Sequence, residues 1–189
     1  YIGVKSGDDV FICPPMDYVS RRLLSEGGWF VRETEHCLNA YRSRFGTQPT
    51  HFALEIGGHI GTQSIQIARS KLFSSVIAVE PAPETFQLLN ANVAINNCGS
   101  TVIPVNVGIA EQSGTAILRR SENNIGATQI VTDLDQSSNE TQTLRVQSVS
   151  DLLEDRGIDA DTLGLLWLDA EGMEPEIFAS ALAAKAVPK

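Results

Sequence analysis

Several features that define other protein classes are scarce in this chain of 189 residues. Its three cysteines lie far apart and form no C-x-x-C pair, so we expect reduced, intracellular thiols. No apolar run approaches the length that spans a bilayer, and no signal peptide opens the chain, which predicts a cytoplasmic protein without a membrane partner. Lys and Arg number 14 against 23 Asp and Glu, giving a formal charge of -9, so a nucleic-acid partner is not expected.

What the chain does have is an alternation of apolar runs and amphipathic stretches. Such alternation is typical of α/β proteins in which buried parallel strands are joined by helices. We expect a Rossmann-like, mostly parallel sheet with helices on both faces. The predicted strands are 52–56, 75–80, 101–107 and 163–168, and the predicted helices that follow are 61–72, 84–97 and 174–182.

The two remaining parts of the chain depart from this alternation. The pattern of residues 1–50 predicts an N-terminal segment of short strands followed by two helices, with a bend at Gly27 and Gly28. Residues 51–189 are the predicted nucleotide-binding domain. Segments 114–118 and 143–149 predict a hairpin or an added sheet edge. The polar loop between them, 123–137, is either a substrate-facing lid or a solvated insertion, with equal weight.

A glycine-rich turn at residues 57–61 organises the rest of the domain. The apolar strand before it ends in Glu55, and Gly57, Gly58 and Gly61 follow closely. Glycine lets backbone N–H groups and a helix N-terminus approach a ligand, because it has no side chain to hold the ligand away. The turn therefore predicts a nucleotide-like cofactor.

Polar side chains also end the other predicted strands: Glu80, Asn106 and Asp169. Ligands of open parallel sheets bind beyond the carboxyl ends of the strands, so we expect these side chains to converge with Glu55 on one site. A carboxylate at the position of Glu80 can accept both hydroxyls of a ribose. A nicotinamide dinucleotide fits this logic too, but the G-x-G-x-x-G spacing would need glycine where His59 stands.

Four motifs resemble the FkbM-type methyltransferases, which use S-adenosylmethionine and have the class I methyltransferase fold. The most specific is WLDAEGMEPE at 167–176, which is similar to the family's I-D-V-E-G-x-E-P-E signature. The other three are EIGGHIG at 55–61, VEP at 79–81 with Glu84 and Asn92 after it, and NVGI at 106–109.

The resemblance implies roles for individual residues. It places Glu55, Gly57, Gly58, His59 and Gly61 along the methionine part of the cofactor, Glu80 and Pro81 at the ribose, Asn106 and Val107 at the adenine, and Asp169 and Glu171 beside the sulfonium and the acceptor. The implied acceptor is a hydroxyl of a sugar or another small natural product. The resemblance says nothing of the oligomeric state.

The chain departs from this family in two respects. His59 replaces the usual asparagine of the loop and Gly58 its alanine, which puts an imidazole near the predicted reacting centre. The class I sheet normally continues with a final strand pair after the last predicted helix, so the domain looks truncated at its C-terminus. An unpaired sheet edge would follow.

A hydroxyl acceptor must lose its proton during methyl transfer. Asp169 is the first candidate base because it ends a strand at the cofactor edge, His59 is the second, and Glu171 is a third acid nearby. The alternative for Asp169 is a cap on the following helix. Asp169 and Glu171 lack a third metal ligand, so no metal is predicted.

Two other functions stay open at this point. One is a noncatalytic cofactor-binding module with the same fold, and the other is an NAD-dependent oxidoreductase.

Overall fold

The computed structural model describes residues 1–119, 129–131, 141–170 and 172–188. Most of the predicted loop at 123–137, and Glu171, lie outside the described residues. Within the described part, no helix combines the length and apolarity needed to cross a membrane.

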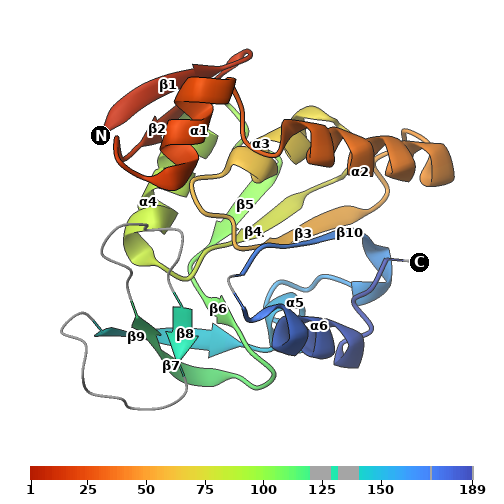
Figure 1. Cartoon of the computed structure of the whole chain (residues 1–189). Helices are drawn as coiled ribbons and strands as arrows, with labels where there is room; N and C mark the ends of the chain where they lie inside the picture. The colour runs from red at the N-terminus through yellow and green to blue at the C-terminus, as the bar shows by residue number, and fades with distance from the viewer. Residues whose placement is uncertain (120–128, 132–140, 171, 189) are drawn as a thin grey trace.

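The central sheet has four parallel strands in the order β10-β3-β4-β5 (Figure 1). The strands are β3 (Phe52–Ile56), β4 (Val76–Val79), β5 (Val102–Val105) and β10 (Leu163–Leu168). Every residue of β3 and β4 is buried, as expected for strands covered on both faces. The predicted parallel α/β sheet is confirmed, and the register pairs Leu168 with Ile56 and Ile56 with Val79, so three strands end together.

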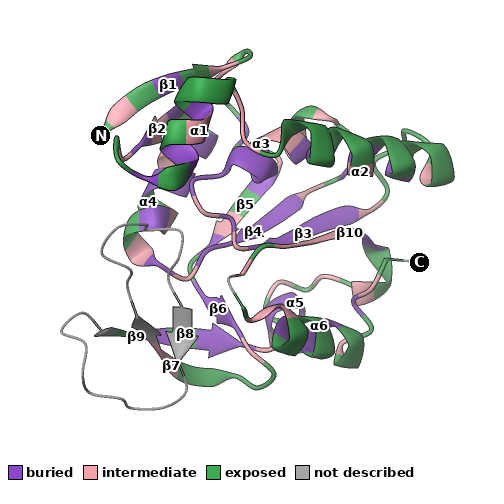
Figure 2. Ribbon diagram, in the orientation of Figure 1, coloured by how far each residue is buried: buried purple, intermediate pink, exposed green. Residues whose placement is uncertain are grey.

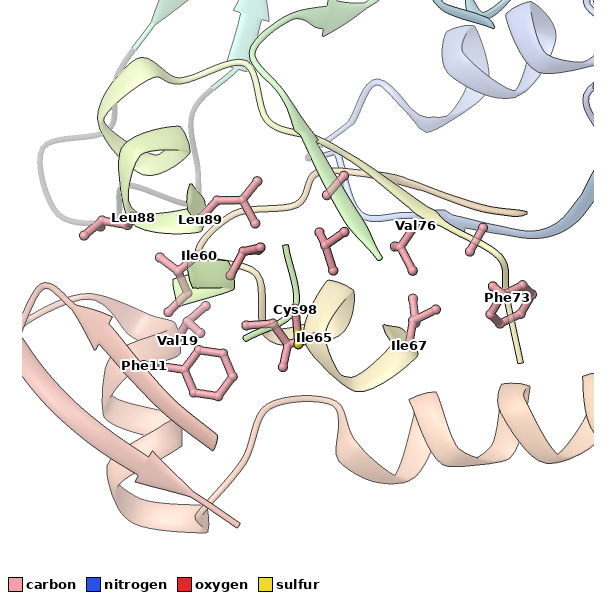
Figure 3. Close-up of a cluster of buried hydrophobic side chains, with 14 of the residues drawn as sticks. Phe11, Val19, Ile60, Ile65, Ile67, Phe73, Val76, Leu88, Leu89 and Cys98 are labelled. Carbon is pink, nitrogen blue, oxygen red and sulfur yellow. The ribbon is translucent and has the colours of Figure 1, made fainter. Parts of the chain in front are cut away.

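Helices cover both faces of this sheet (Figures 1 and 2). One face packs against α1 (Tyr18–Glu26), α2 (Val31–Phe45), α3 (Thr62–Arg69) and α4 (Pro83–Ile95) through one buried apolar cluster (Figure 3). The other face packs against α5 (Val149–Glu154) and α6 (Glu174–Ala183) through a second cluster. The sheet therefore separates two cores.

The N-terminal residues fold against the first of these cores. Strands β1 (Ile2–Ser6) and β2 (Asp9–Cys13) form an antiparallel hairpin, and α1 and α2 follow with the predicted bend between them. Gly27 ends α1 in the left-handed region, with φ 72°. Phe11 of β2 and Val19 of α1 lie in the same cluster as the central strands (Figure 3).

A second, smaller sheet has the order β6-β9-β7-β8. The predicted pair is confirmed as β7 (Gly114–Arg119) antiparallel to β9 (Thr141–Gln147), and it is joined by β6 (Gly108–Ile109) and β8 (Gln129–Val131). The expected strand 101–107 was too long, because β5 ends at Val105. The chain leaves the main sheet after Val105 and enters the smaller sheet at Gly108. A short 3-10 turn, η1 (Ala160–Thr162), leads into β10.

Asn92 of α4 joins the N-terminal hairpin to the glycine turn. Its side chain is fully buried, accepts a hydrogen bond from Ile12 N at 2.7 Å, and donates to Ile12 O at 3.1 Å and Ile60 O at 2.8 Å. One buried side chain thus binds both the hairpin and the turn, and Asn92 holds them together.

We expect Asn92→Ala to lower the free energy of unfolding by about 2–4 kcal/mol, because it leaves buried backbone groups unpaired. Asn90→Ala is the matched control on the same helix, since Asn90 is exposed and only donates to Phe86 O. Urea unfolding measures both changes. Equal losses for the two variants would contradict the joining role of Asn92.

Candidate functional site

The glycine turn is built around close backbone contacts that side chains would prevent. Gly57 N and Gly58 N both donate to Val79 O, at 3.0 and 2.8 Å, which ties the turn to the end of β4. Gly57 has φ 93°, and a Cβ on it would lie 1.9 Å from the carbonyl oxygen of Asp169. Gly61 has φ 90°, and its Cβ would lie 2.8 Å from Leu89. Both positions therefore require glycine.

Gly58 is less constrained than its neighbours. Its φ is not positive, and a Cβ on it would meet Leu89 at 3.3 Å and Val79 O at 3.5 Å. Small movements of the flexible Leu89 side chain relieve the closest of these contacts. An alanine would fit here with a slight adjustment, so the departure at Gly58 changes little in the turn.

The Glu80 carboxyl lies directly against this turn. Its Oε2 accepts a hydrogen bond from His59 N and its Oε1 accepts one from Ala82 N, each at 2.9 Å. Burial raises the pKa of Glu80 to about 7, although the two N–H donors act in the opposite direction. A carboxylate has about four acceptor positions, of which these donors use two, and Glu80 is 6% exposed.

Glu55 lies beneath the turn. It has no exposed surface, and its Oε2 accepts a hydrogen bond from the hydroxyl of Ser64 on α3. Burial is the main cause that raises the pKa of Glu55 to about 8, and the charges of Asp169 and Glu80 add to it. Because the Glu55 side chain has no exposed surface, it can affect a ligand only through its charge, which depends on whether the carboxyl is protonated.

Asp169 follows β10 and faces the same turn. Its N donates to Ile56 O at 3.0 Å, and its carbonyl occupies the space left open by Gly57. The residue keeps exposed surface, but its carboxyl is partly surrounded, and this burial together with the charge of Glu174 raises its pKa. The structure thus brings Glu55, Glu80 and Asp169 together at the strand ends.

Asp169 does not cap the helix that follows. The residue at the N-cap of α6 is Met173, which provides no side-chain cap. Glu174 stabilises this segment instead: its Oε1 accepts from Ala170 N at 3.0 Å and its Oε2 from Gly172 N at 2.9 Å. The capping alternative for Asp169 was therefore wrong, and the Asp169 carboxyl is left available to the site.

Asn106 holds the connection after β4. Its Nδ2 donates to Glu80 O at 2.8 Å and to Pro81 O at 3.0 Å, while Val107 is buried in the second core. These bonds draw the chain away from the main sheet after β5. The predicted contacts of Asn106 and Val107 with an adenine, and of Pro81 with a ribose, stay predictions.

His59 lies near Asp17, the N-cap residue of α1, whose charge acts on the His59 ring. It is in the left-handed region, with φ 45°, and both ring nitrogens are buried without a hydrogen-bond partner among the described residues. Burial lowers the pKa of His59, and the negative charge of Asp17 opposes this change. The residue as a whole is half-buried, but its two ring nitrogens, the atoms that would take a proton from an acceptor, are buried.

The sequence pointed to the strand-end acids but missed several residues that support them. These are Ser64 under Glu55, Glu174 beside Asp169, and Asp17 near His59. Only Glu174 carried a signal, as an acid in the first turn of a helix after a glycine. Asn92, which follows the VEP motif in sequence, is buried and binds Ile12 and Ile60. Trp29 and Phe30, between α1 and α2, pack against each other, and Phe30 also packs against Trp167.

No cluster of three or more His, Cys, Asp or Glu side chains suited to a metal ion occurs in the described ranges. The absence of a metal requirement stays a prediction.

Comparison with known proteins gives matches to methyltransferases. The sequence model of one family, described as "Methyltransferase FkbM domain", matches residues 55–187. "Methyltransferase sdnD" of Sordaria araneosa is 29% identical over 82 residues, which are 43% of this chain and 30% of that protein. The matched part thus spans less than a third of that curated relative.

Among solved structures, TYW2 of M. jannaschii in complex with AdoMet is similar at 20% identity and a TM-score of 0.40, covering 55% of this chain and 42% of that one. A putative transferase, PH0793 of Pyrococcus horikoshii, is similar at 24% identity and a TM-score of 0.34, covering 41% and 27%. The M. jannaschii tRNA m1G37 methyltransferase is similar at 16% identity and a TM-score of 0.39, covering 55% and 29%.

The buried carboxyl of Glu55 predicts a pH-dependent stability. In the unfolded chain it ionises near the ordinary pKa of 4.5, whereas the folded chain keeps its proton until about pH 8. Because the folded state then binds more protons, stability falls as the pH rises from 4.5 to 8. We expect Glu55→Gln to reduce this fall. Between pH 5 and pH 8.5, the drop in Tm of the wild type should exceed the drop in Tm of the variant by about 3 °C or more.

Glu35→Gln, on the exposed face of α2, is the control for this measurement. Thermal unfolding at a series of pH values follows all three proteins. Parallel Tm curves for the wild type and Glu55→Gln would show that Glu55 ionises normally in the folded chain.

Proposed function

Because this chain belongs to the FkbM methyltransferase family, whose members use S-adenosylmethionine, we propose that it transfers the methyl group of that cofactor to a hydroxyl oxygen of a sugar or another small natural product. S-adenosylmethionine supplies a methyl group on a positively charged sulfonium, which leaves as a neutral thioether. The protein's part is then to hold the two reactants in line and to accept the hydroxyl proton.

The observation that carries the proposal is the convergence of three carboxyl groups at one glycine turn. Glu80 and Asp169 flank the turn and Glu55 lies beneath it, and each has a pKa above its ordinary value. Such a cluster favours a ligand with positive charge, because a cation relieves the cost of ionising neighbouring acids. S-adenosylmethionine carries a sulfonium and an ammonium group.

The same cluster argues against a dinucleotide. The pyrophosphate of NAD is anionic, and the carboxyl groups that are ionised beside the turn would repel it. Neither the family nor the electrostatics of the turn supports an NAD-dependent oxidoreductase.

We assign cofactor contacts to the turn and to the ends of the strands. Gly57, Gly58, His59 and Gly61 form the turn, Glu80 has two free acceptor positions for the ribose hydroxyls, and Pro81, Asn106 and Val107 continue this edge toward the adenine. Glu80 contributes most to this assignment, because its carboxyl is already held in place by two backbone donors.

Asp169 is the proposed general base. Its carboxyl is not used as a helix cap, and its raised pKa makes it a stronger base than an ordinary aspartate. The ring nitrogens of His59 are buried, so His59 is better suited to supporting the turn than to proton transfer. Glu171, close to Asp169 in sequence, stays a candidate for binding the acceptor.

A small acceptor fits the charge of the protein better than a polyanion does. The chain carries a formal charge of -9, which disfavours contact with a phosphate backbone. One of the solved structures named above is a tRNA methyltransferase, so the test includes tRNA as the contrasting acceptor.

Cofactor binding should depend on the ionised form of Glu80. Isothermal titration is expected to give S-adenosylmethionine binding that weakens as the pH falls below about 7, where Glu80 takes up a proton. Glu80→Gln should weaken binding about tenfold or more at pH 8, since a hydrogen bond to a charged group contributes about 1.5–3 kcal/mol. Tight binding of NAD without binding of S-adenosylmethionine would overturn the cofactor assignment.

Catalysis should depend on Asp169 more than cofactor binding does. With a radiolabelled methyl donor and a panel of sugars, hydroxylated natural products and tRNA, we expect transfer to a small hydroxyl compound. For that acceptor, Asp169→Asn should lower kcat about 100-fold, the usual size of a general-base contribution, while cofactor affinity stays within about threefold. Asp8→Asn, on the exposed β1–β2 turn, is the control.

Two outcomes would contradict this account. Transfer to tRNA alone would replace the small-molecule acceptor, and cofactor binding without transfer to any acceptor would favour a noncatalytic binding module.

A further inference from the structure

Three residues near the start of α1 have buried side-chain atoms that lack a hydrogen-bond partner within the described part of the chain. These atoms are Oδ1 of Asp17, the hydroxyl of Ser20, and both ring nitrogens of His59. Asp17 and Ser20 are at most 4% exposed. We call these three residues the Asp17 cluster.

The backbone brings the members of this cluster together. Asn92 binds Ile12 and Ile60 with one side chain, so residue 59 of the turn lies beside the end of β2. From there the chain makes a short turn, closed by Asp17 N donating to Pro14 O, and enters α1. Phe11 of β2, Val19 of α1 and Ile60 of the glycine turn lie together in the same apolar core (Figure 3).

The electrostatics of the cluster agree with this placement. The negative charge of Asp17 acts on His59. Burial is the main cause that raises the pKa of the Cys13 thiol; the nearby Ser20 hydroxyl lowers this pKa, and the charge of Asp17 raises it further. Asp17 is the charged group of the N-terminal segment that acts on His59, and Glu80 accepts a hydrogen bond from the backbone N of His59. No other acid of the N-terminal segment acts on His59 in the described part of the molecule.

The hydrogen-bonding capacities of the three side chains are complementary. Oδ2 of Asp17 already accepts from Val19 N and Ser20 N as the cap of α1, at 3.0 and 3.4 Å, which leaves Oδ1 as a free acceptor. A neutral imidazole has one N–H donor and one acceptor nitrogen, and a serine hydroxyl can donate. A buried polar group without a partner costs about 1–3 kcal/mol, so a bridge between these atoms through a buried water is favoured.

We propose that Asp17 is a positioning residue for His59: its free Oδ1 receives the ring proton of His59 through one buried water, and so fixes the ring and the glycine turn. The ring of His59 is held from α1 while its backbone N donates to Glu80 Oε2 at 2.9 Å. Asp17 thereby acts on the predicted ribose carboxylate through His59. The functional half of this inference rests on the proposed function.

The inference gives the family departure at His59 a physical role. His59 has φ 45°, a conformation that costs a non-glycine residue about 1 kcal/mol or more. A water-mediated bond from Asp17 to the ring offsets that cost and keeps the backbone N of His59 directed at Glu80.

The test uses Asp17→Asn, which separates the two functions of Asp17. Asparagine is as good a helix cap as aspartate, so α1 is retained. Its remaining group is an NH2 donor, which cannot accept the ring proton. Nitrogen-15 NMR reports the tautomer of each imidazole, and the chain has only three histidines, of which His59→Gln identifies the relevant signals.

In the wild type we expect a single His59 tautomer with a slowly exchanging ring proton. In Asp17→Asn we expect the other tautomer or an average of the two, with ring-proton exchange at least tenfold faster. Asp9→Asn, in the β1–β2 hairpin outside the cluster, should leave the His59 signals unchanged. Identical His59 signals in the wild type and Asp17→Asn would overturn the inference.

Cofactor titration then tests the functional half. Asp17→Asn should weaken S-adenosylmethionine binding about fivefold, and in a His59→Asn background the same change should have no further effect. Additive losses would overturn the route through His59. If the wild type shows the coupled ring signals but binds no S-adenosylmethionine, the proposed function fails while the contact between Asp17 and His59 stands.

Discussion

The site depends on one backbone contact, the carbonyl of Asp169 lying against the Cα of Gly57. A Cβ at Gly57 would come within 1.9 Å of that oxygen, so the ends of β10 and β3 can meet only if residue 57 is glycine. The same turn is bound to the end of β4 through Val79 O. Because three strand ends are joined at one point, Glu55, Glu80 and Asp169 share one small region although they are far apart in sequence.

The convergence of these carboxyl groups lowers the stability of the folded chain but favours binding of a cation. Burial of carboxyl groups next to one another raises their pKa values and makes the folded chain less stable as they ionise. A ligand with positive charge reverses this effect, because it favours the ionised forms. The features that weaken the empty turn at alkaline pH are therefore the features that suit it to a sulfonium cofactor.

Much of the fold followed from the sequence, because buried parallel strands are continuous apolar runs and their acidic ends meet at one sheet edge. The positions of Glu80 and Asp169 beside the turn follow from that rule. The direction of a side chain does not. Glu55 points into the core toward Ser64, and His59 lies near Asp17, because both depend on how helices distant in sequence pack against the strands. The hydrogen bonds of Asn92 and Asn106 are hidden from sequence for the same reason.

The most direct test of this account compares S-adenosylmethionine binding by Gly57→Ala and Gly58→Ala. Both variants add one methyl group to the same turn, but only the one at Gly57 meets the backbone of Asp169 and a positive φ. The account predicts that Gly57→Ala loses cofactor binding by about 100-fold or more, about 2.7 kcal/mol, while Gly58→Ala stays within about fivefold of the wild type. Equal affinities for the two variants in isothermal titration would contradict it.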